Sequence, residues 1–371
     1  MAQIGNSFRF TGTFTRIKEG GKLEEIKEIT SKNNPKWSGR VLNFNIKTQT
    51  GNQLVQLFGG KMEGGNILAF SKEKDEKGKA IKLEIPYSKR FEKGVIDSVA
   101  NFNKNSILDR EFITELDAID YIEENMIDFD GKRVTVTGKV DFDTYKGKVL
   151  TRYQVQNIYD AKDDSKDGFF GNLALFVTSN SITEDYKKGK EVNYKLVEKE
   201  RKIPVEAYVE QYNKDKESRK EKPHLYLPIT TFINVSDKFD FDNDSHMKAL
   251  KFRIETLMIK KGIWEIGMEV RFFKGQESEE IKEEDLTKFE KAQIESGVKT
   301  FDEIAKGKQG YGDFKEEIQL KSFHSKYTDG LLETDLTEDN LEDLFFEPEE
   351  ESEDKKETTD VEKIDDDEDL F

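Results

Sequence analysis

Short runs of alternating polar and apolar residues dominate the first half of the chain, and this period of two is typical of β-strands with one buried face. The runs cover residues 8–17, 40–49, 52–58, 131–142 and 149–161. Between the third and fourth runs Phe112, Leu116 and Ile119 recur at intervals of three or four residues, which predicts a helix over 108–126. The predicted order is three strands, a helix and two strands.

The second half repeats this order. Strand patterns cover residues 172–182, 202–212, 224–236, 264–275 and 314–324, and a helix pattern covers 245–262. The helix pattern begins at Asp244 or Ser245, both favourable N-cap residues, and ends at Gly262. A further helical insert is predicted near 284–306, between the last two strands.

The two halves also share a short motif in the strand after the helix. It consists of a glycine, a valine and a phenylalanine, at Gly138, Val140 and Phe142 and again at Gly267, Val270 and Phe272. Three strands, a helix and two strands is the order of the OB barrel, and internal similarity favours tandem copies of one unit. We therefore predict a mainly β fold, with two tandem OB-like β-barrel domains and a few helices. The expected domains are 1–163 and 164–328, followed by a disordered acidic tail at 329–371.

Charge is distributed unevenly along the chain. From Glu333 onward there are 20 acidic residues and 3 basic ones, a net charge of −17, which equals the net charge of all 371 residues. The rest of the chain is therefore neutral. Leu332, Leu336 and Leu341 predict a short helix that docks on the body or on a partner. Beyond Pro348 the tail has too few apolar residues to fold by itself.

Composition excludes several kinds of site. The chain has no cysteine, which excludes disulfides, cysteine-bound zinc and thiolate nucleophiles. The first ten residues lack the pattern of a secretory signal, and no stretch approaches 18 apolar residues. We therefore expect a cytoplasmic protein with no membrane contact.

Motifs for catalysis or metal binding are weak. The glycine-rich stretch 58–66 lacks the Lys-Ser/Thr ending of a phosphate-binding loop, and we expect a flexible loop there. Residues 240–245 resemble the start of a calcium loop, but Ser245 replaces the glycine of the sharp turn and Lys251 replaces the final glutamate. The three histidines lie on different predicted elements. We predict no enzyme activity, no catalytic residue, no metal site and no cofactor.

The sequence does indicate a binding surface for single-stranded nucleic acid, which is held by aromatic rings that stack on bases and by cations that follow the phosphates. In the strand 202–212 one face is apolar, whereas Tyr208 and Tyr212 lie on the other. Tyr226 lies opposite the apolar face of the next strand, and Lys214 belongs to the loop between the two strands. Cross-strand packing and a contact between the two domains are the alternatives for these tyrosines.

Candidate binding residues in the first half lie in loops, at the ends of strands or on outward strand positions. They are Trp37, Arg40, Lys47, Tyr87, Lys89, Arg90, Phe91, Tyr145, Lys146, Lys148 and Arg152. The four residues 87 and 89–91 belong to a long insertion, 60–105, that fits a flap over a flexible strand, with plain loop packing as the alternative. Tyr153 is in phase with Val149 and Val155, which predicts that it lies in the core.

The chain ends in an acidic run followed by two apolar residues. The residues concerned are Asp365, Asp366, Asp367, Glu368, Asp369, Leu370 and Phe371. Such an end fits a partner with a basic rim and an apolar pocket for the terminal ring. A tethered acidic tail would also compete with nucleic acid for a cationic groove.

This tail resembles the C-terminal tip of single-stranded DNA-binding proteins of bacteria and phages, which also ends in aspartates and a terminal Phe. The present tip lacks the penultimate proline of the bacterial proteins. The resemblance implies sequence-tolerant binding of single-stranded DNA in replication, recombination and repair. It also implies that the tip recruits replication proteins such as a polymerase, helicase or primase, and a phage-encoded protein of this kind would act in the cytoplasm of a bacterial host.

Two other classes of protein remain open. A protein–protein adaptor or acidic chaperone with OB-like domains would explain the acidic tail and the neutral body. An enzyme that carries an OB module, such as a nuclease or ligase fragment, would require a catalytic lysine or a metal signature, which the sequence does not display.

Overall fold

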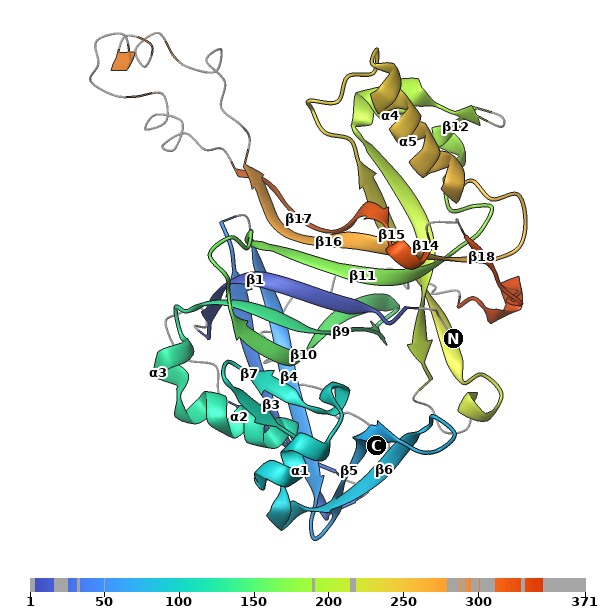
Figure 1. Cartoon of the computed structure of the whole chain (residues 1–371). Coiled ribbons are helices and arrows are strands. Elements are labelled where there is room, and N and C mark those ends of the chain that lie inside the picture. Colours follow the sequence, from blue (N-terminus) through green and yellow to red (C-terminus); the bar gives the residue numbers. More distant parts are fainter. Residues whose placement is uncertain are drawn as a thin grey trace, which may run out of the picture.

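The computed structural model describes most of the chain. The described residues are 4–16, 26–31, 34–49, 51–188, 191–213, 218–278, 311–327 and 331–342, together with positions 287, 291, 293, 294 and 300. The fold is mainly β, and most of its strands join in one large mixed sheet that curls into partial rings (Figure 1).

The first ring contains the five strands predicted in the first half, and they are confirmed. The strands are β1 (Ser7–Thr15), β3 (Trp37–Lys47), β4 (Asn52–Met62), β9 (Arg133–Tyr145) and β10 (Lys148–Asp160). They pair in the order β1–β3–β4–β10–β9, and β9 pairs again with β1. The parallel contact between β4 and β10 is a single residue pair, Gln56 with Gln154, so this is where the ring is weakest.

The second ring contains the five strands predicted in the second half. They are β11 (Gly168–Val177), β14 (Lys202–Tyr212), β15 (His224–Asn234), β16 (Trp264–Ser278) and β17 (Tyr311–Phe323). The pairing order is β11–β14–β15–β17–β16, and β16 pairs again with β11. The contact between β15 and β17 is parallel, like the contact between β4 and β10 in the first ring. The contact between β11 and β14 is a single residue pair, Phe176 with Tyr208.

The two rings share a core because their first strands pair with each other. In Figure 1 β1 and β11 run side by side through the middle of the molecule, and Ser7 to Thr11 pair with Asn172 to Gly168. The buried ring of Phe10 lies 5.2 Å from Phe169 and 5.9 Å from Phe272, between ring centroids. Tyr153 is also in this cluster, as predicted, and burial raises its pKa.

Among the described residues, the longest helix of each half lies between the third and fourth strands of its ring. Helix α2 (Glu115–Glu124) begins at Thr114, whose side chain accepts a hydrogen bond from the Asp117 backbone N–H, and it buries Leu116, Ile119 and Ile122. It is shorter than the predicted 108–126, because the chain before it forms a small hairpin of β7 (Asn105–Ile107) and β8 (Arg110–Phe112).

Helix α5 (Asp244–Leu257) begins one residue before the predicted range. Its N-cap is Asn243, not Asp244 or Ser245, because the Asn243 side chain accepts hydrogen bonds from the backbone N–H groups of Ser245 and His246. The remaining helices are short, namely α1 (Lys93–Ser98), α3 (Met126–Phe129) and α4 (Tyr194–Glu200).

Residues 58–66 do not form the predicted loop. Strand β4 continues to Met62, and only then does the chain turn into the hairpin of β5 (Asn66–Lys74) and β6 (Ala80–Pro86). Gly60 lies under the ring of Trp37, and Gly59 lies against the first turn of α2, so a Cβ atom at either position would collide. These glycines therefore permit close packing of a strand.

The last described segment, 331–342, lies against the second ring. Strand β18 (Leu332–Glu333) pairs with the start of β16, and Leu341 forms a β-bridge with Tyr226. The segment contains a 3₁₀ turn at Glu338–Asn340 where the spacing of its leucines predicts a helix.

Three more short strands are β2 (Lys27–Thr30), β12 (Lys187–Lys188) and β13 (Glu191–Val192). No helix in the described part of the chain is both long and apolar enough to cross a membrane. The predicted insert near 284–306 lies outside the described residues except for the isolated positions given above.

Candidate nucleic-acid interface

The β5–β6 hairpin has its own small core. Ala69 and Ile85 pack with Val99 and with Ile113, which lies just before α2. This cluster is separate from the main core of the two rings. It holds the hairpin beside the start of α2, at the lower end of the first ring in Figure 1.

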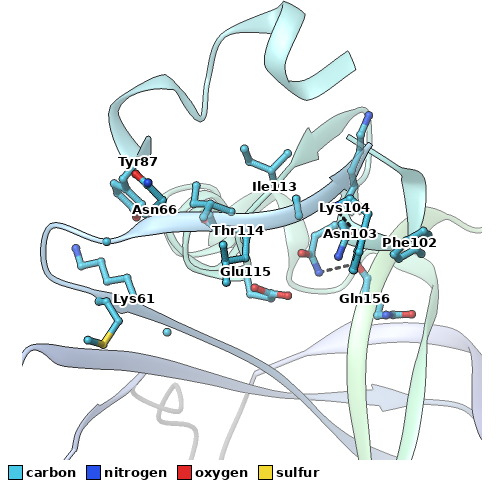
Figure 2. Close-up of a pocket in the computed structure, with 18 of the residues that line it drawn as sticks. Lys61, Asn66, Tyr87, Phe102, Asn103, Lys104, Ile113, Thr114, Glu115 and Gln156 are labelled. Atoms are coloured by element: carbon cyan, nitrogen blue, oxygen red, sulfur yellow. Dashed lines mark hydrogen bonds between the residues drawn. The ribbon is translucent and has the colours of Figure 1, made fainter. Parts of the chain in front are cut away.

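Two hollows adjoin each other beneath this hairpin. The larger is a cavity of about 480 Å³ between β5, the end of β4, β7 and the start of α2 (Figure 2). The smaller, about 330 Å³, lies between the turn at 63–64 and residues 35–38. Lys61, Met62 and Tyr87 line both hollows, so we treat the two as one feature, the hairpin groove.

The hairpin groove is positively charged. Its lining includes five lysines and two glutamates: Lys36, Lys61, Lys82, Lys104, Lys139, Glu63 and Glu115. Lys104 is the exception among the lysines, because it is buried and its Nζ forms an ion pair with Glu111 at 2.9 Å. Within the described part of the chain, the other four lysines have no salt bridge, so their charges are available to an anion.

Aromatic rings lie along the groove. Tyr87 lies where the two hollows meet, and Phe102 forms one end of the larger cavity (Figure 2). Phe102 is 65% exposed and lies 5.9 Å from the ring of Phe70, which also lines the cavity. An exposed aromatic ring beside a cationic groove is a surface on which a nucleobase can stack.

A polar network holds Tyr87 in place. The Arg90 guanidinium lies 3.9 Å from the Tyr87 ring centroid, and its Nε donates to the buried Asp117 carboxylate at 2.9 Å. The Thr114 hydroxyl donates to the same carboxylate at 2.6 Å. Burial, together with the charge of Asp117, raises the pKa of Tyr87. Arg90, predicted to contact a ligand, is thus occupied in fixing the turn at 87–91 to α2.

The other residues predicted in this region have different surroundings. Phe91 is 60% exposed and Lys89 is also exposed, but neither lines the groove. Trp37 is half-buried, and its ring packs on Gly39 and Gly60. Arg40 lies among carboxylates of α2: it forms an ion pair with Asp120, and its Nη2 donates to Glu123 at 2.7 Å. The guanidinium charge is therefore already neutralised.

The predicted rim at the β9–β10 turn lies outside the hairpin groove. Tyr145 is 44% exposed, with the Lys146 Nζ 5.3 Å from its ring centroid, and Lys148 is exposed. Arg152 forms an ion pair with Asp143 at 3.1 Å. Lys47 is exposed at the end of β3.

The prediction that Tyr226 presents its ring to solvent is wrong. Tyr226 is 8% exposed, and its ring lies 4.9 Å from that of Phe176 under the segment 331–342. Burial and the neighbouring carboxylate of Glu210 raise the pKa of Tyr226 to about 12. Tyr208 packs in the same cluster with Leu336 and Leu341.

Tyr212 has a more exposed position than its neighbours on the same face. It is 42% exposed, and its hydroxyl oxygen accepts a hydrogen bond from Arg219 at 2.8 Å. Lys214 and the whole C-terminal tip, Asp365 to Phe371, lie outside the described residues.

Several residues of the groove were not singled out from the sequence, among them Lys61, Lys82, Phe102 and Lys139. Lys139 could have been found, because it occupies an outward position in the alternating pattern of β9. The others could not, because the hairpin that brings them together was predicted only as an irregular flap.

The outer face of the central sheet extends away from the groove. Lys139 pairs with Ser7 of β1, and two residues further along β1 Arg9 pairs with Phe170 of β11. Directly paired residues point to the same side of a sheet, so Lys139, Arg9 and Phe170 share one face. Phe170 is 43% exposed, and no described residue forms an ion pair with Arg9.

In the described residues, no three histidine or acidic side chains gather in an arrangement that could hold a metal ion.

No protein-family model, curated protein or solved structure shows significant similarity to this chain.

Proposed function

We propose that this protein binds single-stranded DNA through the hairpin groove of its first ring. The observation that carries the proposal is the combination in one groove of unpaired lysines, Lys36, Lys61, Lys82 and Lys139, with the exposed ring of Phe102. Unstacked bases have a free face for an aromatic ring, and their phosphates pair with lysine. A duplex offers no such face, so the groove favours single strands. The proposed activity is binding and requires no chemical step.

The pairing order supports the assignment of OB-like domains. Each ring has the order first–second–third–fifth–fourth strand, with a parallel contact between the third and fifth and a helix between the third and fourth. This is the arrangement of a five-stranded, partly open Greek-key barrel, in which the second and third strands bind oligonucleotides. The hairpin groove begins at the end of β4, the third strand of the first ring.

A strand that leaves the groove past Lys139 would next meet Arg9 and Phe170 on the outer face of the central sheet. These residues repeat the chemistry of the groove, a cation next to an exposed ring. We propose that this face extends the binding path from the first ring toward the second.

The acidic tail is proposed to have two roles, in competition with DNA and in recruitment of replication proteins. Its point of attachment is on the second ring, where Glu342 forms an ion pair with Lys222 at 3.5 Å. From there the acidic residues can compete with DNA phosphates for the lysines at high effective concentration. When DNA displaces the tail, the tip from Asp365 to Phe371 becomes available to a polymerase, helicase or primase.

The groove is tested by removing its charge. The variant Lys61→Ala/Lys82→Ala/Lys139→Ala should bind oligothymidine about tenfold more weakly at low salt. Its salt dependence, as the slope of log K against log salt concentration, should be less steep by about 2, since each phosphate contact to a single strand contributes about 0.7. Fluorescence anisotropy measures both quantities.

The matched control removes three exposed lysines on α5 or close to it in the chain, Lys238, Lys248 and Lys260, which the described structure shows without salt bridges. Its affinity and salt slope should stay close to those of the unmodified chain. Equal losses in the two triple variants would mean that the protein binds through general charge and would overturn the assignment of the groove.

A further inference from the structure

Glu115 is an exposed residue that lines the hairpin groove. It is the first residue of α2, and its side chain extends into the larger cavity toward Gln156 (Figure 2). Water reaches the carboxylate through the mouth of the cavity. Partial desolvation by the surrounding atoms nevertheless raises the pKa of Glu115. A groove that only held phosphates would have no use for a negative charge here.

The carboxylate of Glu115 is short of hydrogen-bond donors. Its own backbone N–H donates to it, and Lys139 is the cation that acts on it, without the close approach of a salt bridge. No side chain in the described part of the chain donates a hydrogen bond to it. Most of the acceptor capacity of a carboxylate therefore remains available to a ligand.

The rest of the cavity fits a flat heterocycle. Ile67, Leu68, Ala69 and Ile113 supply apolar walls, and Gln156 and Asn66 supply side-chain amides. Neither of these two amides has a side-chain hydrogen bond to a described residue. The volume of about 480 Å³ is in the range of pockets for small organic ligands and holds one nucleotide unit. Single-stranded bases are commonly read in such pockets by contacts to their Watson–Crick edge.

We infer that this cavity takes one base of the bound strand, that it prefers guanine, and that Glu115 is the residue that selects it. The inference rests on the proposed function. The Watson–Crick edge of guanine carries two adjacent donors, N1–H and the N2 amino group, which match the two oxygens of a carboxylate. The amides of Gln156 or Asn66 can donate to the O6 oxygen beside them.

The other bases match this arrangement less well. Thymine has one donor, N3–H, between two carbonyl oxygens, and these oxygens would face the carboxylate. Adenine and cytosine each have one amino donor, next to a ring nitrogen that is an acceptor. Guanine alone offers a carboxylate two charge-assisted hydrogen bonds, and such bonds are the strong ones.

The preference is measured by anisotropy with four 12-nucleotide strands: all thymidine, and thymidine strands with two isolated guanosines, two isolated inosines or two isolated adenosines. A bidentate contact to a base typically discriminates by one to two orders of magnitude. We expect the guanosine strand to bind about tenfold more tightly than oligothymidine. Inosine lacks only the N2 amino group, so its strand should fall between the two.

The variant Glu115→Gln should lose the preference for guanosine and still bind oligothymidine at least as tightly as the unmodified chain, because a negative charge is removed. The control is Glu124→Gln, an exposed glutamate at the other end of α2, which should keep the full preference. Thermal melting of both variants checks that the fold is intact.

Equal binding of guanosine and thymidine strands by the unmodified chain would overturn the inference, and so would a preference that survives Glu115→Gln. In both cases oligothymidine would still bind, and the proposed function would stand. A chain that bound none of the four strands would instead remove the proposed function itself.

Discussion

The ring of Phe102 and the ring of Tyr226 show how the surroundings of a single residue decide its role. Phe102 lies beside the hairpin groove with about two thirds of its surface exposed, whereas Tyr226 is covered by Leu341 and its neighbours. Sequence alternation places Tyr226 correctly on the side of β15 that faces away from the ring core. It cannot predict that a segment more than one hundred residues later covers that side.

The same limit applies to Arg40, since its partners Asp120 and Glu123 lie about eighty residues away in the sequence. Tyr153 could be predicted because its burial depends only on its phase within its own strand. For single residues, therefore, local pattern predicts the direction of a side chain, and long-range contacts decide whether it is free.

We expect Phe102→Ala to weaken binding of oligothymidine about tenfold, because stacking of one base on a ring contributes about 1–3 kcal/mol. The unfolding free energy should change little, since the ring is mostly exposed. Phe252→Ala is the control, because Phe252 on α5 is 61% exposed and far from the groove in sequence. Anisotropy and urea unfolding measure the two effects. Equal loss of affinity in both variants would contradict a specific role for Phe102.

Among the elements, the hairpin of β5 and β6 contributes most to the groove. The ten strands of the two rings follow from alternating patterns and turn residues in the sequence, and so does their order around the helices. The hairpin was expected only as a flap, because charged residues interrupt its alternation at 71–79. Its small core lies mostly between its own strands and α1, and this core becomes visible only in three dimensions.

Replacing residues 66–86 by a short Gly-Ser linker should reduce binding of oligothymidine to the level of the triple lysine variant, because one wall of the groove is removed. The chain should remain folded, since the hairpin core is separate from the main core. A control that replaces only the tip, residues 75–79, by Asn-Gly keeps every lining residue and should bind normally. Circular dichroism and anisotropy provide the readouts. Normal binding without the hairpin would place the interface elsewhere.

For the whole molecule, the arrangement of the two rings has a consequence for binding. The surface of the second ring that includes Tyr208 and Tyr226 is covered by the segment 331–342, whereas the first ring has the open hairpin groove. The similarity of the two halves in sequence therefore does not extend to equal exposure of their surfaces. It is reflected instead in the pairing order of the strands and in the shared motif, whose Phe142 and Phe272 are both buried.

The charge distribution is also a property of the whole molecule. The neutral body contains a local excess of lysine in the groove, and the negative charge is concentrated beyond Glu333. Removal of residues 347–371 should therefore increase affinity for single strands, and the increase should shrink as salt screens the competing charges. The segment 331–342 stays in place in this truncated chain, so Tyr226 remains covered.

The most direct test is one titration at low salt, in which the full chain and the chain ending at Phe346 each bind a labelled oligothymidine and a duplex of equal length. We expect both chains to prefer the single strand, and the shortened chain to bind it about tenfold more tightly. Equal affinity for single strand and duplex in both chains would contradict the proposed binding of single-stranded DNA.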